Sequence, residues 1–90
     1  MDRFDQMRVF LAVADAGSFA AAADQLALSR PAVSRHVAQL ESRLGVRLIQ
    51  RTTRRLSLTH EGSAFLEDCQ RLLADVANAE ASVSAGGVKA

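Results

Sequence analysis

The chain of 90 residues has little of what covalent cross-linking or membrane insertion requires. It contains a single cysteine, Cys69, so no disulfide can form within the chain and a reducing, cytosolic compartment is the default expectation. The longest uninterrupted apolar run, residues 9–14, is too short for a membrane span or for the core of a signal peptide. The composition therefore excludes a disulfide-bonded scaffold and gives no sign of a membrane protein.

Residue patterns typical of metal sites and enzymes are also missing. The two histidines, His36 and His60, do not combine with Cys69 at a zinc-ligand spacing. No pairing of a nucleophile with a base stands out, and no glycine-rich loop is present that could cradle a phosphate. We therefore expect no metal, no cofactor and no catalytic residue.

Charge is present but unevenly distributed. Residues 30–55 hold seven arginines and one acid, Glu41, a net charge of +6, in a chain whose total is +1. Residues 1–29 carry two arginines and four aspartates, and residues 56–90 carry two basic and five acidic residues, so these segments sum to −2 and −3. A local basic surface of this kind is expected of a protein that binds a phosphate backbone, although a merely solvated charged face is the alternative.

The first half of the chain predicts three helices. Apolar residues recur with helical period over residues 4–16, and Gly17 is suited to end that helix. Ser18 can cap a second, shorter helix, and Ser29 can cap a third, over about 30–44. Two helices joined by a tight turn, the second of them basic at its start, predict a helix-turn-helix.

The second half predicts a hairpin and a long helix. After Gly45, alternating residues over 48–58 predict a two-stranded wing. Thr59 can cap a fourth helix of about 25 residues, over 59–85, and the glycine pair that follows predicts a flexible tail at 86–90. One small domain with 49% hydrophobic residues buries only ~60% of its unfolded surface, which leaves room for a partner chain.

The third helix has two different faces. At 100° per residue one core stripe contains Val33, Val37, Leu40 and Leu44. The opposite face is small and polar apart from one arginine, and consists of Pro31, Ser34, Arg35, Ala38 and Ser42. Arg35 suits bidentate contact with guanine, Ser34 a base edge or phosphate, and Arg30 the bases or phosphate beside the helix start. An ordinary surface helix is the alternative interpretation.

The other polar residues of the basic segment lie in three places. His36 flanks the core stripe and is expected to be packed or partly exposed rather than a ligand. Arg43 and Arg47 lie near the end of the third helix, where a structural role through the helix dipole is at least as plausible as a DNA contact. The hairpin tip is more specific, because arginines and threonine hydroxyls without an acid suit the sugar-phosphate backbone or minor groove: Arg51, Thr52, Thr53, Arg54 and Arg55.

The fourth helix carries an apolar seam with heptad spacing. Its members are Phe65, Cys69, Leu72, Val76, Ala79 and Val83, widened by Leu66, Leu73 and Ala77. A core of this size cannot cover so long a seam, so part of it is expected to meet a second chain, and acids on the other faces keep the helix away from DNA. A helix folded back entirely on its own domain is the alternative. Cys69 is expected to be a buried, inert thiol.

Several motifs together carry a resemblance to a known family. They are Gly17-Ser18-Phe19 with Ala22-Ala23, Ser29-Arg30-Pro31-Ala32-Val33-Ser34-Arg35, Leu40-Glu41, Leu44-Gly45-Val46-Arg47-Leu48, Arg51-Thr52 and Leu58-Thr59-His60-Glu61-Gly62. Over about residues 1–85 the chain resembles the N-terminal DNA-binding domain of LysR-type bacterial transcriptional regulators. The resemblance implies a mainly α winged helix-turn-helix over 1–58, with DNA contacts at Arg30, Pro31, Ser34, Arg35, Arg51 and Arg54. Arg30 and His36 stand where glutamine is frequent in the family, and Ile49 where phenylalanine is.

The resemblance also implies an assembly and a location. Residues 59–85 would form a linker helix that pairs antiparallel in a homodimer, which sets two reading heads on an interrupted inverted repeat in double-stranded DNA. A larger C-terminal domain that binds a small-molecule inducer and supports tetramers has no counterpart in these 90 residues, so we expect a longer protein to contain them. The protein would act in the bacterial cytoplasm, on the nucleoid and not at a membrane.

Two other functions fit parts of the pattern. A dimerisation or adaptor module could present the basic patch to an acidic protein, and would show no preference among DNA sequences. An architectural, sequence-blind DNA binder would more usually be rich in lysine, whereas Lys89 is the only lysine here.

Overall fold

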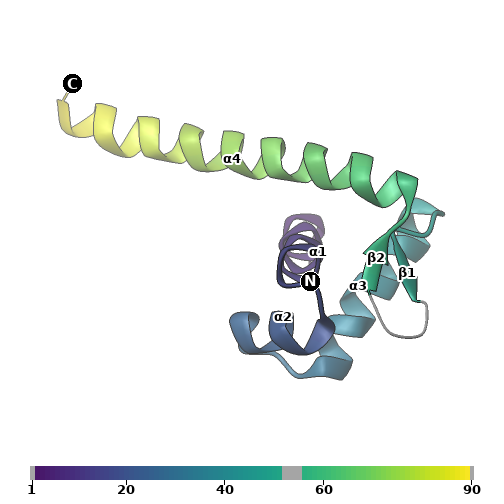
Figure 1. Ribbon diagram of the computed structural model, residues 1–90. Helices are drawn as coiled ribbons and strands as arrows, with labels where there is room; N and C mark the ends of the chain where they lie inside the picture. The colour runs from purple at the N-terminus through teal and green to yellow at the C-terminus, as the bar shows by residue number, and fades with distance from the viewer. Residues whose placement is uncertain (1, 52–55, 90) are drawn as a thin grey trace.

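A computed structural model of the protein describes residues 2–51 and 56–89. Four helices and one antiparallel hairpin follow one another along the chain (Figure 1): α1 (Arg3–Ala16), α2 (Phe19–Leu26), α3 (Arg30–Leu44), β1 (Ile49–Arg51), β2 (Leu56–Leu58) and α4 (His60–Lys89). The mainly α, winged helix-turn-helix class predicted from the sequence is confirmed.

Side-chain caps determine where the four helices begin. Each cap oxygen accepts a hydrogen bond from the backbone N–H three residues ahead: Asp2 from Asp5 at 2.8 Å, Ser18 from Ala21 at 3.0 Å, Ser29 from Ala32 at 3.2 Å and Thr59 from Gly62 at 2.9 Å. The caps expected at Ser18, Ser29 and Thr59 are confirmed. Because each bond satisfies an amide that has no partner inside its helix, the helix starts are fixed by local sequence.

Left-handed residues end the first three helices. Gly17 and Gly45 have φ of 77° and 75°, as expected from the sequence. Ala27 also adopts the left-handed region, with φ of 55°, and its neighbour Leu28 donates to the Ala23 carbonyl at 3.0 Å. This conformation costs a non-glycine residue roughly 1–2 kcal/mol, and it gives the three-residue turn between α2 and α3.

The core surrounds α1, which packs against α2, α3 and α4 (Figure 1). Its fully buried members are Phe10, Val13, Ala22, Val33, Val37, Leu40, Leu48, Ile49 and Cys69. The ring of Phe10 lies 5.8 Å from that of Phe65 on α4, centroid to centroid. Leu44, placed on the core stripe by its helical angle, is instead 38% exposed, because it is the last residue of α3 and the chain turns away at Gly45.

Helix α4 is longer than predicted and gives the molecule its shape. Its 30 residues correspond to roughly 45 Å, and the molecule measures 54 × 26 × 20 Å. The prediction that the helix ends before Gly86 is wrong, because α4 continues through residues 86–89. Glycine within a helix costs about 0.5–1 kcal/mol but keeps its N–H donor, so it weakens the helix without ending it. Over the described residues, no helix is long and apolar enough to cross a membrane.

Candidate nucleic-acid interface

The two faces of α3 differ as the sequence predicts. Val33, Val37 and Leu40 are fully buried in the core. On the opposite side the side chains are small or basic and reach solvent, with Arg30, Pro31 and Arg35 exposed and Ser34 partly exposed. Helix α3 is therefore held by one face and leaves the other free to approach a partner closely.

The start of α3 adds a favourable site for an anion. In the first turn, the Ala32 amide donates to the hydroxyl of the capping residue Ser29. Pro31 has no N–H that would need a partner. The first turn contains no acid, and the partial positive charge of a helix start favours phosphate. Arg30 is the first residue of this turn, so its positive charge adds to the positive potential that the helix start presents to an anion.

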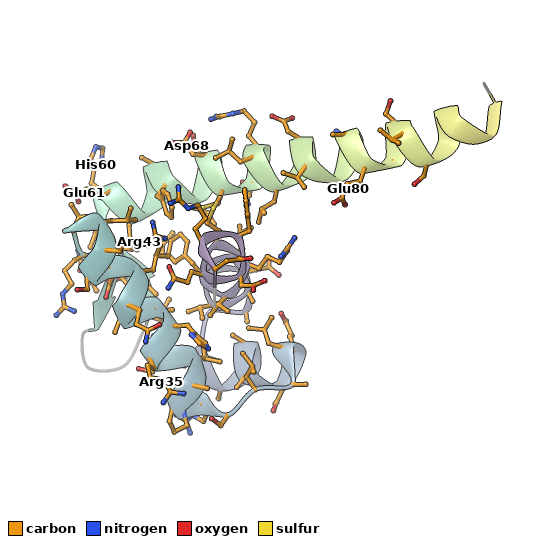
Figure 2. All side chains as sticks on the ribbon, turned by 180° about the vertical axis from the view of Figure 1, so that it is seen from behind. Arg35, Arg43, His60, Glu61, Asp68 and Glu80 are labelled. Carbon is orange, nitrogen blue, oxygen red and sulfur yellow. The ribbon has the colours of Figure 1, made fainter. Side chains whose placement is uncertain are left out.

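Arg30 and Arg35 are free cations within the described part of the chain. Neither makes an ion pair or a hydrogen bond with residues 2–51 or 56–89. Figure 2 shows Arg35 at the end of α3 farthest from α4, with its side chain directed outward. Figure 2 shows Glu61, Asp68 and Glu80 along α4, away from Arg35. All five acids of α4 are exposed: Glu61, Glu67, Asp68, Asp75 and Glu80. The charge separation seen along the chain is therefore also a separation in space.

Two further arginines of the basic segment have partners within the protein. Arg43 donates to Oε1 of Gln6 through Nη2 at 2.8 Å and Nε at 3.3 Å, which joins α3 to the start of α1. Nη1 of Arg47 lies 4.0 Å from Oε1 of Glu41. The structural role considered for Arg43 thus has a defined partner, Gln6, which is buried at 7% exposure and was missed by sequence reasoning.

Sequence reasoning also missed the function of Glu41. This residue is buried, with 7% exposure, and its Oε2 accepts from the amides of Leu48 at 2.8 Å and Ile49 at 3.1 Å. It therefore ties the last turns of α3 to the first strand of the wing. The available signal was that Glu41 is the one acid among seven arginines, which is an unusual position for a residue that only solvates a surface.

The wing is a short antiparallel pair with one buried side. Ile49 pairs with Leu58 and Gln50 with Ser57, and the polar pair is exposed whereas Ile49 is buried. The alternation predicted over 48–58 is present in these strands. Arg51 belongs to β1, and the predicted contacts Thr52, Thr53 and Arg54 lie outside the described residues.

Two sequence predictions concern side chains near the core. His36 is half-buried, as expected, and its Nδ1 is buried with no hydrogen-bond partner in residues 2–51 and 56–89. Cys69 is fully buried, and burial with the nearby charge of Asp68 raises its thiol pKa from 9.0 to about 11, which fits the inert thiol predicted. No three His, Cys, Asp or Glu side chains gather at a possible metal site in the described ranges.

The seam of α4 is divided between two environments. Phe65, Cys69 and Leu73 belong to or pack against the core of the domain. Beyond them the seam is increasingly solvated: Val76 is half-buried, Ala79 is exposed and Val83 is 75% exposed. Leu72, within the first half, is also 42% exposed. The expectation that the domain cannot cover the entire seam is confirmed, because an apolar stripe remains open along the distal half.

Comparison with known proteins gives a consistent result. Residues 4–63 match the family described as "Bacterial regulatory helix-turn-helix protein, lysR family". The chain is 51% identical over 86 residues to the HTH-type transcriptional repressor PA14_22550 of Pseudomonas aeruginosa, and 48% identical over 81 residues to the HTH-type transcriptional regulator CrgA of Neisseria meningitidis. These alignments cover 96% and 90% of this chain but 27% of each relative, so the chain spans about a quarter of their length.

Solved structures show the same fold. The crystal structure of the BenM_DBD/catB site 1 DNA complex superposes with a TM-score of 0.91 at 32% identity, covering 97% of both chains. The CbnR_DBD-DNA complex superposes with a TM-score of 0.88 at 41% identity, covering 97% of this chain and 99% of the other. With sequence and structure matched over nearly its whole length, the chain belongs to the lysR family of bacterial regulatory helix-turn-helix proteins.

Proposed function

We propose that this chain is the sequence-specific, double-stranded DNA-binding part of a longer bacterial transcriptional regulator. Residues 30–44 enter the major groove, with Arg30, Pro31, Ser34 and Arg35 toward the DNA. The wing, over 48–58, holds the backbone or minor groove through Arg51, Thr52, Thr53 and Arg54. The protein works on the nucleoid in the bacterial cytoplasm.

One observation carries this proposal: α3 has a buried apolar face, Arg35 on the opposite face and Arg30 at the helix start, and both arginines are free in the described part of the chain. Guanidinium groups make bidentate hydrogen bonds to guanine and bind phosphate, and small residues beside them permit close approach to a groove floor. Two relatives of the same fold were solved as DNA complexes, which supports the same use of this surface.

We also propose an assembly that doubles this surface. In it, residues 1–58 form the reading head and the linker helix pairs with its counterpart through the open seam: Phe65, Cys69, Leu72, Leu73, Val76, Ala79 and Val83. A homodimer of this kind requires two half-sites, and so an interrupted inverted repeat. Tetramers and response to a small-molecule inducer would reside in the remaining three quarters of a protein as long as its relatives.

A selection of binding sites from random duplexes at two salt concentrations tests this function. The unmodified chain is expected to enrich a two-part site. Arg35→Ala should weaken binding to the best site by ~1–3 kcal/mol and remove preference at one base pair of each half-site, because a base contact is lost. Arg54→Ala should weaken binding to all sequences about equally and lower the salt slope by ~1, because a phosphate contact is lost.

The two variants serve as controls for one another. Unchanged base preferences after Arg35→Ala would make Arg35 a phosphate clamp and not a reader. If the unmodified chain enriches no sequence at either salt concentration, the reading of bases fails, and the adaptor interpretation with an acidic protein partner takes its place.

A further inference from the structure

The backbone of Leu48 is the meeting point of three elements. Its amide donates to Oε2 of Glu41 on α3, at 2.8 Å. Its carbonyl accepts from the amide of Thr59, immediately before α4, at 3.0 Å. Leu48 itself is fully buried and directly precedes β1, so one residue links the recognition helix, the wing and the linker helix.

The contacts around Leu48 leave little freedom for movement. Thr59 also donates from its hydroxyl to the Arg47 carbonyl at 2.6 Å, while the same oxygen caps α4. A Cβ added at Gly62 would overlap the carbonyl oxygen of Leu48, so the first turn of α4 lies directly against this strand. The base of the wing is therefore clamped from α3 by Glu41 and from α4 by Thr59 and Gly62.

The negative charge of Glu41 is opposite in sign to the charges of the other ionisable residues in its segment. It is the only acid in a segment of net charge +6, and a carboxylate close to a phosphate-binding surface repels the ligand. A neutral residue would serve phosphate binding better. The buried carboxylate instead accepts two backbone hydrogen bonds from adjacent amides, which are stronger when the acceptor is charged.

We propose that Glu41 is a positioning residue that fixes the wing and the start of α4 relative to α3, so that base reading and backbone binding occur together. The inference rests on the proposed function, because it concerns how two DNA-binding elements are held in register. Glu41 itself is not expected to touch DNA, since its side chain is only 8% exposed and faces the protein.

A double-mutant cycle of DNA affinity tests the role. Glu41→Ala is combined separately with Arg54→Ala, between β1 and β2, and with Arg35→Ala on α3, and each protein is titrated on the best selected duplex. Glu41→Ala alone should weaken binding about tenfold. Most of that loss should vanish in the Arg54→Ala background, where the wing contact is already gone, and persist in the Arg35→Ala background.

Matched variants separate positioning from charge and from folding. Glu41→Gln keeps an oxygen that can accept both bonds and should retain most of the affinity, while Glu67→Gln removes the same charge from an exposed position on α4 and should leave both affinity and base preference intact. Amide exchange at Leu48 and Ile49 should accelerate in Glu41→Ala but not in Glu67→Gln. Thr59→Val removes the hydroxyl that binds the Arg47 carbonyl and so loosens the same strand from the α4 side, whereas Thr59→Ser keeps the hydroxyl and is its control. The loss of DNA affinity caused by Thr59→Val should be about threefold smaller in the Arg54→Ala background. This variant is used for the test if Glu41→Ala does not fold.

The results separate a failure of the proposed function from a failure of the positioning role. If the unmodified chain selects no duplex, the proposed function fails. If it selects a site, the loss of DNA affinity caused by Glu41→Ala is compared between the Arg35→Ala and Arg54→Ala backgrounds, with Thr59→Val in place of Glu41→Ala if that variant does not fold. An equal fold-loss of affinity in both backgrounds would mean that Glu41 only stabilises the fold, and would overturn the positioning role.

Discussion

The two halves of α4 share one heptad spacing of apolar residues but lie in different environments. Up to Leu73 the seam residues other than Leu72 pack on the core, and the ring of Phe65 meets that of Phe10. From Val76 onward the same heptad spacing continues, but the residues become half-buried or exposed, up to 75% at Val83. The difference lies in what faces the helix, because α1 reaches only the first half (Figure 1).

This comparison shows how one helix can serve two purposes. Burial of the first half stabilises the domain and anchors the helix, whereas the second half projects beyond the core and carries an exposed apolar stripe. Exposed stripes of this kind mark interaction sites, and a second copy of the same helix is the partner that a heptad seam suits. Three measurements sharpen the comparison.

Breaking the distal half should have the largest effect on assembly. Val76→Asp places a charge in the seam beyond the core, where pairing would bury it without a partner, so the dimer dissociation constant should rise by about 100-fold or more. Sedimentation velocity over a range of concentrations measures this. Ala81→Asp, on the face opposite the seam, is the control and should leave the dimer intact. An unmodified chain that stays monomeric at every concentration would assign the distal stripe another role.

Breaking the proximal half should instead lower the stability of the single domain. Phe65→Ala removes the ring that packs on Phe10, and because Phe65 is only half-buried we expect a loss of about 2 kcal/mol in the free energy of unfolding. Urea denaturation in the Val76→Asp background keeps both states monomeric. In that background Val83→Ala should change stability by less than about 0.5 kcal/mol. Equal losses for the two variants would mean that the halves are not distinct.

Thiol reactivity gives the most local contrast, because it compares two single side chains and changes neither assembly nor folding. In an Ala81→Cys chain two thiols lie on one helix, and at pH 8 the exposed one should react with an alkylating reagent more than 100-fold faster. Burial raises the pKa of Cys69 to about 11, so almost none of it is thiolate at that pH. Since the folded-state pKa is the higher one, Cys69 should destabilise the fold only as pH rises from 9 toward 11. Similar rates for both thiols would show that the first half opens readily.

Local chemistry made much of the fold predictable from the sequence. Ser18, Ser29 and Thr59 cap their helices through a bond to the amide three residues on, and Gly17 and Gly45 supply left-handed ends. Such contacts depend on neighbours in the chain, so their positions can be found without tertiary structure. The two faces of α3 were likewise predictable, because helical period alone separates Val33, Val37 and Leu40 from Arg35.

Predictions failed where the outcome depended on how far an element extends. Leu44 has the angle of a core residue but lies in the last turn of α3, so its exposure depends on where α1 and the chain beyond Gly45 run. Gly86 and Gly87 were expected to end α4, yet a glycine pair lowers helix stability without preventing hydrogen bonds, and the helix continues to Lys89.

By itself, then, the sequence determined the helix starts, the amphipathic faces, the excess of arginine in the middle of the chain and the heptad seam, since each depends on spacing along one chain. Only the tertiary structure decided that Arg43 turns to Gln6, that Glu41 clamps Leu48, and that the seam divides after Leu73. These outcomes join residues from different elements, and hydrogen bonds and burial across such distances depend on the packing of α1 against its neighbours.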